Sequence, residues 1–269
     1  MKGKYFILSV VLVMLGIQSC SDSLDRGLVL HSSFEEDASD SGPNHYDGSL
    51  VGGAVISDDA AVGKGSVYLN GDGAYVEYPA GNVYFEGDYS VSIWVKWDEC
   101  HVWDRILDFN QAEPKGGNAV TWLVGRPAQG TENNMWLDQW VLHEDIAVES
   151  ILDQRARPAD AYLGYNIHLG QWEHYVIVYD SSAENPYGTQ VNTMGQNVPL
   201  QGKVTLYVNG VKAGENTHCL KPQHAVTVAN WLGRSRFAPD PFFKGWMDDF
   251  RIYDRQLTEA EVKTLYKKH

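Results

Sequence analysis

Apolar and polar residues alternate over many short segments of this chain, and this period of two limits the possible folds more than any other feature. In residues 90–97 the odd positions hold Val, Ile, Val and Trp, whereas the even positions hold Ser, Ser, Trp and Lys. Because successive side chains of a β-strand point to opposite faces, this segment is predicted to be a half-buried strand. Residues 172–179 are apolar on both faces, which predicts a central strand.

Turn and helix signals agree with this pattern. Asn209-Gly210 joins the apolar runs 204–208 and 211–213, and Asn-Gly favours the positive φ angles of a type I′ hairpin. Further strands are predicted at 28–35, 66–69, 74–78, 104–109, 119–125, 134–142, 162–168, 226–232 and 246–253. Thr258 and Glu261 have the spacing of a capping box, which predicts one helix over 259–267. Many short strands and one terminal helix predict an all-β protein with two packed antiparallel sheets, in a single domain over 28–269.

The amino terminus has the pattern of a secretion signal. Lys2 and Lys4 precede an apolar run over 5–17 that is too short to span a bilayer, and Cys20 follows. The segment 1–19 resembles a bacterial lipoprotein signal, which implies lipid attachment at Cys20 and a tether over 20–27. That resemblance also implies an extracytoplasmic protein at the outer membrane or cell surface. The alternative is an ordinary cleaved signal with an incidental cysteine.

The charge of the chain restricts its partners. Residues 1–19 contain two lysines and no acidic residue, so the remainder has 19 basic and 35 acidic residues, a net charge of −16. Polyanion binding needs a basic surface that releases counterions, and the sequence contains no basic stripe. Nucleic acids and anionic polysaccharides are therefore disfavoured, whereas neutral sugars and divalent cations fit better.

The chain resembles a known family in several short motifs that occur in the family's order. They are 27–35 with the loop 40–48, 67–76, 172–176, 206–210, 232–235 and 243–258. These motifs resemble the laminin-G-like jelly-roll family of the concanavalin A-like lectin/glucanase superfamily, over most of 28–266. The resemblance implies a two-sheet antiparallel jelly-roll sandwich. Because the superfamily includes lectins, adhesins and glycoside hydrolases, the fold does not decide the function.

The same resemblance implies a structural calcium ion where the loop after the first strand meets the last strand. Asp40 and Asp248 match the expected carboxylate ligands, and the backbone near His45 would add carbonyl oxygen, the ligand type that Ca²⁺ prefers. The alternative is that these acids cap turns and face water.

A second candidate site is a sugar-binding face within residues 97–143. Indole rings stack on the C–H faces of pyranose rings, and planar polar groups hold the hydroxyls. The predicted ligand residues are Trp103, Arg105, Asp108, Trp122, Arg126, Asn133, Trp136, Trp140 and His143. The alternative is that some of these tryptophans are core residues.

No catalytic residues are predicted. Hydrolases of the superfamily carry Glu-x-Asp-x-x-Glu on one strand, but in 143–149 the nucleophile position holds His143. The sequence therefore favours non-catalytic glycan binding by a surface-anchored, lectin-like domain that is accessory to polysaccharide uptake. A glycoside hydrolase with a different acid pair and a protein-binding adhesin are the alternatives.

Two cysteines besides Cys20 are available for pairing. Outside the cytoplasm, Cys100 and Cys219 are predicted to form a disulfide if the fold brings them together. The alternative is two separate buried thiols.

Overall fold

The computed structural model describes most of residues 24–268. Excepted are positions 83, 86, 102, 187 and 218 and the segments 111–117, 126–133, 142–145, 151–166, 192–196 and 220–226. For 118–125, 134–141, 146–150, 189–191 and 197–199 only the backbone is described. Residues 1–23, which contain the predicted signal and Cys20, lie outside the described part. Within that part, no helix has the length and apolar character needed to cross a membrane.

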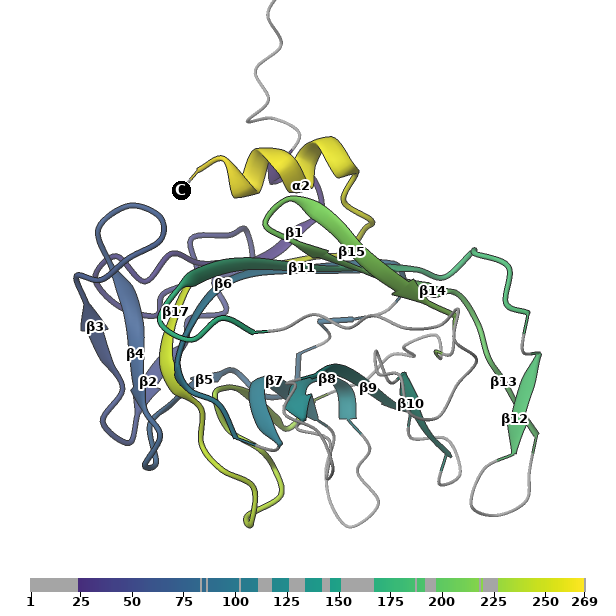
Figure 1. The fold of residues 1–269 in the computed structure, drawn as a ribbon, viewed down its shortest axis with the longest axis horizontal. Helices are drawn as coiled ribbons and strands as arrows, with labels where there is room; N and C mark the ends of the chain where they lie inside the picture. The colour runs from purple at the N-terminus through teal and green to yellow at the C-terminus, as the bar shows by residue number, and fades with distance from the viewer. Residues whose placement is uncertain are drawn as a thin grey trace, which may run out of the picture.

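Two antiparallel sheets pack face to face, as the sequence predicts (Figure 1). The first sheet has the strand order β15 (Val211–Asn216), β14 (Lys203–Val208), β11 (Trp172–Asp180), β6 (Tyr89–Glu99), β17 (Lys244–Tyr253), β4 (Ser66–Asn70) and β3 (Val55–Ser57), and β1 (Leu28–Ser32) pairs with β17. The second sheet has the order β10 (Ile146–Ser150), β9 (Asn134–Val141), β8 (Asn118–Gly125), β7 (Asp104–Asn110), β16 (Ala229–Leu232), β5 (Tyr75–Tyr78) and β2 (Ser49–Val51). Strands β12 (Thr189–Val191) and β13 (Asn197–Pro199) form a separate pair.

The main core lies between the sheets. The odd-numbered residues of β6, such as Val91 and Ile93, pack there against residues of the second sheet that include Leu107, Phe109 and Leu232. The hairpin prediction is confirmed, because Asn209 and Gly210 have φ angles of 50° and 75° between β14 and β15.

A third layer covers the outer face of the first sheet. Helix α2 (Glu259–Tyr266) lies across this face (Figure 1), and its capping box between Thr258 and Glu261 is present as predicted. Together with Leu24, the helix residues Val262 and Leu265 bury the outer face of β11 and Tyr253 of β17.

This layer corrects the prediction that β6 is half-buried. Ser90, Ser92 and Trp94 are buried on the outer face, and the indole of Trp94 stacks on His174 and on Tyr266 of α2. The strand is therefore buried on both faces. The predicted strand over 162–168 falls mostly outside the described residues, and Ile167 and His168 are not in a strand.

The predicted disulfide is also wrong. Cys100 and Cys219 are both buried thiols with no disulfide between them. Cys100 directly follows the carboxyl end of β6. Cys219 lies near Tyr179, which pairs with Tyr89 at the opposite end of β6. The two sulfurs are thus separated by about the length of an eleven-residue strand, roughly 35 Å, far beyond disulfide reach.

Candidate functional site

Asp40 closes the loop that follows β1. Its carboxylate accepts hydrogen bonds from the backbone amides of His31, Gly42 and Tyr46, at 2.8, 2.7 and 2.8 Å. Residue 45 has a φ of 52° in this loop, and its side chain is exposed. Asp40 therefore acts as a backbone cap that fixes the turn.

Asp248 caps a different segment. Its Oδ2 accepts from the amides of Ala61 and Val62 at 2.9 and 2.8 Å, and its Oδ1 accepts from the amide of Asp249. Burial raises the pKa of Asp248 to about 7, although the three amide donors oppose this shift.

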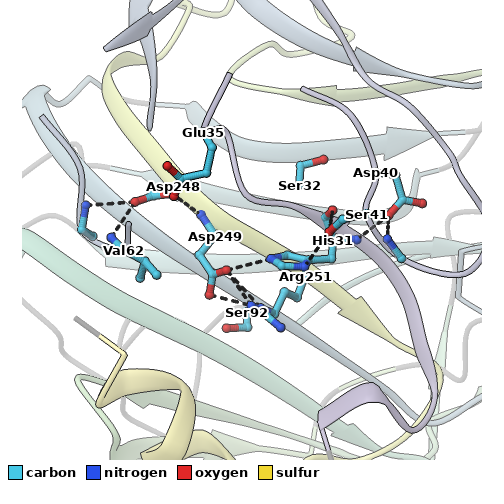
Figure 2. Close-up of polar contacts among 12 residues, drawn as sticks. His31, Ser32, Glu35, Asp40, Ser41, Val62, Ser92, Asp248, Asp249 and Arg251 are labelled. Atoms are coloured by element: carbon cyan, nitrogen blue, oxygen red, sulfur yellow. Dashed lines mark hydrogen bonds and ion pairs between the residues drawn. The ribbon is translucent and has the colours of Figure 1, made fainter. Parts of the chain in front are cut away.

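These residues do not fit a calcium site. Figure 2 shows Asp40 and Asp248 on opposite sides of His31, and their carboxylates bind separate sets of amides. In the described part of the chain, no group of three or more His, Cys, Asp or Glu residues could hold a metal ion. Calcium binding stays a prediction that this geometry does not support.

Between the two aspartates, a network of polar contacts joins β1 to β17. Asp249 accepts from His31 Nε2 at 2.8 Å and from Arg251 Nη2 at 2.8 Å, and Ser41 Oγ contacts His31 Nδ1 at 2.9 Å (Figure 2). Burial alone would raise the pKa of Asp249. The hydrogen bond from His31 and the charge of Arg251 outweigh burial and hold this pKa well below its usual range.

The order hydroxyl, imidazole, carboxylate also occurs in nucleophilic catalysis, which additionally needs amide donors directed at a reacting oxygen. Here the amides of Ser41 and Gly42 donate to the His31 carbonyl and to Asp40. The network is therefore a structural connection between two strands.

The outer face of the second sheet carries a different set of residues. Trp231 lies opposite Asp108 on one side and opposite Glu77 on the other in the strand register, so the three positions share one face. Their neighbours Leu107, Val76 and Leu232 point into the core. A register shift between Arg105 and Leu107 places Arg105 beside Asp108. We call this surface the open face.

A buried ionic cluster holds the loop between β16 and β17 against the open face. Arg105 Nη2 donates to Asp240 Oδ2 at 2.9 Å, and Ser235 Oγ donates to the same oxygen at 2.7 Å. Asp108 accepts from the amide of Arg236 at 3.1 Å, and its Oδ2 lies 3.6 Å from Arg105 Nε. The guanidinium of Arg105 is only 3% exposed, so these contacts form away from bulk water.

Two exposed aromatic residues flank this cluster. Trp103 is 41% exposed, and its carbonyl accepts from Arg105 Nη1 at 2.8 Å. Phe237 is 42% exposed, and its amide donates to Ser235 Oγ at 3.0 Å. Trp103 has a φ of 71°, a left-handed conformation that is strained for an aromatic residue. Strain of this kind accumulates at functional sites, where the surrounding structure maintains it.

For the other predicted ligand residues, the structure gives at most the position in the strand register. In the register, Trp122 is opposite Leu107, which places position 122 on the core-facing side. Position 138 is opposite Thr121, and Thr121 is opposite Asp108, so Trp136 and Trp140 occupy positions on the open face. Arg126, Asn133 and His143 lie outside the described residues.

Several open-face residues are absent from the predicted set. Ser235, Phe237 and Asp240 come from the β16–β17 loop, far from Arg105 in the sequence. The run Arg-Ser-Arg-Phe over 234–237, with two basic residues beside an aromatic one, is the signal that could have identified this loop.

A match to a family model identifies the superfamily of this chain. Residues 70–263 match the laminin-G-like model described as "Concanavalin A-like lectin/glucanases superfamily". This chain belongs to that superfamily. No curated protein sequence matches it significantly.

Solved structures show the same concanavalin A-like fold. Domain 4 of AbnA, a GH43 extracellular arabinanase from Geobacillus stearothermophilus solved with arabinotriose, has a TM-score of 0.62 and 22% identity, over 89% of this chain and 98% of the domain. The binding domain of Paraclostridial Mosquitocidal Protein 1 has a TM-score of 0.57 and 17% identity, over 90% of this chain and 52% of its own. The botulinum neurotoxin serotype D binding domain has a TM-score of 0.55 and 15% identity, over 90% of this chain and 52% of the neurotoxin chain. At these identities the similarity concerns the fold alone.

In this concanavalin A-like domain, the two sheets differ in accessibility. Helix α2 and Leu24 cover the part of the first sheet's outer face that carries Val176, Tyr207 and Tyr253. Trp103 and Phe237, which flank the ionic cluster of the open face, are exposed. The open face, with its buried ionic cluster and adjacent exposed aromatic residues, is the candidate functional site.

Proposed function

We propose that this domain binds glycans, without cleaving them, on the open face of its second sheet. The observation that carries the proposal is Trp103, an exposed indole in a strained backbone conformation that the buried Arg105 supports through the Trp103 carbonyl. Exposed aromatic rings beside fixed polar groups suit the C–H faces and hydroxyls of a sugar. The arabinotriose-bound arabinanase domain, which has the same fold, is consistent with this function.

The experiment is a binding panel of neutral oligosaccharides, including arabinotriose, measured by calorimetry. Wild type is compared with Trp103→Ala and Phe237→Ala, and Val211→Ala is the control because Val211 is exposed on the hairpin of the first sheet. We expect the two open-face variants to lose about tenfold or more in affinity, as for loss of an aromatic anchor, while the control is unchanged. Equal affinities for all four proteins would place the sugar site elsewhere. Binding to protein receptors without any glycan binding would favour the adhesin.

A second candidate function, glycoside hydrolysis, rests on one register observation. Position 138 of β9 lies opposite position 149 of β10, and both positions carry an acidic residue, Asp138 and Glu149. Directly opposed residues have Cβ atoms about 5 Å apart. Retaining glycosidases use carboxyl groups about 5 Å apart. Shortened products from a bound polysaccharide, lost in Asp138→Asn and in Glu149→Gln, would favour this function over simple binding.

We also propose that Cys20 carries a lipid that holds the domain at the outer membrane or cell surface, where it would serve polysaccharide uptake. The basis is the signal-like segment 1–19 and the cysteine that follows it. Metabolic labelling with a radioactive fatty acid tests this assignment, since the label is expected on wild type and not on Cys20→Ser.

A further inference from the structure

Among the residues that the structure describes, Arg234 on the open face has no acidic partner for its positive charge. Its guanidinium carbon lies 4.2 Å from the ring centre of Trp231 and 4.6 Å from that of Tyr75. Within the described residues it forms no hydrogen bond and no ion pair. Its side chain is partly exposed, so its N–H groups are accessible to a ligand.

Other arginines of the domain are used differently. Arg105, Arg251 and Arg255 each donate to a carboxylate of the domain, namely Asp240, Asp249 and Glu261. Those ion pairs fix the position of each of the three guanidinium groups. Among the described residues, Arg234 contacts aromatic rings and no carboxylate, so its planar set of donors stays available to a ligand.

The two rings form a corner that fixes the guanidinium. The centres of Tyr75 and Trp231 are 6.0 Å apart with the planes at 74°, and Arg234 lies about equally far from both. The three distances describe a triangle, so the cation is in the corner and is not enclosed between parallel rings. Trp231 is itself held by a hydrogen bond from its Nε1 to Glu77 Oε1 at 3.0 Å.

This corner is continuous with the proposed glycan site. Trp231 is the register neighbour of Asp108, and Arg234 and Phe237 belong to the same β16–β17 loop. A sugar chain that contacts Trp103 or Phe237 therefore has a fixed guanidinium within the same surface.

We propose that Arg234, positioned by Tyr75 and Trp231, binds the carboxylate of a uronic acid residue in the glycan. The planar donors of arginine match a carboxylate in a two-point geometry, and the adjacent rings suit the C–H face of the same sugar. This inference rests on the proposed function. The formal net charge of −14 disfavours densely charged polyanions, so the ligand is a mostly neutral glycan with isolated uronic acids.

The experiment uses matched pairs of oligosaccharides on several backbones, each pair identical except that one member carries a single glucuronate. Affinities are measured for wild type, Arg234→Ala, Arg234→Lys and the control Arg26→Ala. Arg26 is exposed near α2, so the control removes the same charge from the opposite side of the domain. In parallel, the arginine Nε–H resonances of wild type are followed by NMR during titration with sodium glucuronate.

We expect wild type and Arg26→Ala to prefer the acidic member by about tenfold, the size of a charge-assisted hydrogen bond pair at a partly exposed site. Arg234→Ala should bind both members equally, Arg234→Lys should keep only part of the preference, and glucuronate should shift the Arg234 Nε–H resonance. Equal binding of both members by wild type would overturn the uronate assignment while leaving glycan binding intact. A sulfated member that binds as tightly as the acidic one would overturn the choice of carboxylate. If no member of any pair binds, the proposed function itself fails.

Discussion

Arg105 on β7 and Asp240 in the β16–β17 loop form an ion pair 2.9 Å long, and the guanidinium is almost fully buried. Removing one partner of a buried pair leaves an uncompensated charge. The resulting loss of stability is larger than the net stability that the intact pair contributes. This pair therefore connects the stability of the loop to the shape of the open face.

The first prediction concerns Asp240→Asn. We expect the free energy of unfolding to fall by about 1–3 kcal/mol, because Arg105 loses its charged partner in the loop and Asp108 stays as a more distant carboxylate. Glycan affinity should fall as well, since the same loop carries Phe237. Denaturant unfolding and calorimetry measure the two effects. Asp72→Asn, at an exposed position of the β4–β5 turn, is the matched control and should change neither.

The second prediction separates the backbone of Trp103 from its ring. Glycine adopts a φ of 71° freely, whereas alanine does not, so Trp103→Gly should be about 1 kcal/mol more stable than Trp103→Ala. Both variants lack the indole and should bind glycan equally poorly. Equal stability of the two variants in urea would show that the positive φ is not maintained in solution.

The third prediction follows from the burial of His174, whose Nε2 contacts Ser92 Oγ at 2.8 Å. Burial lowers the pKa of His174 to about 3, whereas an unfolded histidine titrates near 6.5. Below about pH 6.5 the unfolded chain therefore takes up a proton that the folded chain does not. The free energy of unfolding should fall by up to about 1.4 kcal/mol per pH unit from this group.

The test compares urea unfolding of wild type and His174→Gln at about pH 7 and about pH 4.5. We expect the variant to lose less stability on acidification than wild type does. Parallel losses would mean that His174 is protonated in the folded domain.

The fourth prediction concerns the two buried thiols. Since Cys100 and Cys219 form no disulfide, a reducing agent should leave the thermal midpoint unchanged. A native disulfide would be worth about 2–4 kcal/mol, and its reduction would lower the midpoint visibly. A thiol reagent should also react with both cysteines fully only after denaturation, because both are buried.

The fifth prediction concerns calcium. Because backbone amides already occupy the carboxylates of Asp40 and Asp248, we expect thermal scans with calcium and with a chelator to coincide. A midpoint that rises with calcium would restore the predicted site, since a ligand that binds only the folded state stabilises it.

Local patterns in the sequence were sufficient for much of the fold. The alternation in β6, the apolar run of β11 and the capping box of α2 each depend on residues close together in the chain, and each predicted an element that is present. Only the half-burial of β6 was wrong, because α2 covers its outer face. The short strands β2 and β3 were missed, because three residues are too few to display a period.

Features that depend on distant residues could not be predicted. Arg105 and Asp240 are 135 positions apart, so nothing near Arg105 indicates that a loop closes over it. The burial of Trp94 depends on Tyr266, from a helix at the other end of the chain. The separation of Cys100 from Cys219 depends on the direction of β6 within its sheet, which the spacing of the cysteines does not reveal.

The position of Leu24 beneath α2 determines how the domain is presented. Leu24 packs against Val262 and Leu265 of α2. In Figure 1, α2 and the β16–β17 loop lie on opposite sides of the two sheets. An attachment through the residues before Leu24 would therefore reach the domain on the α2 side. A domain held in this way would turn the Phe237 loop toward polymers in the surrounding medium.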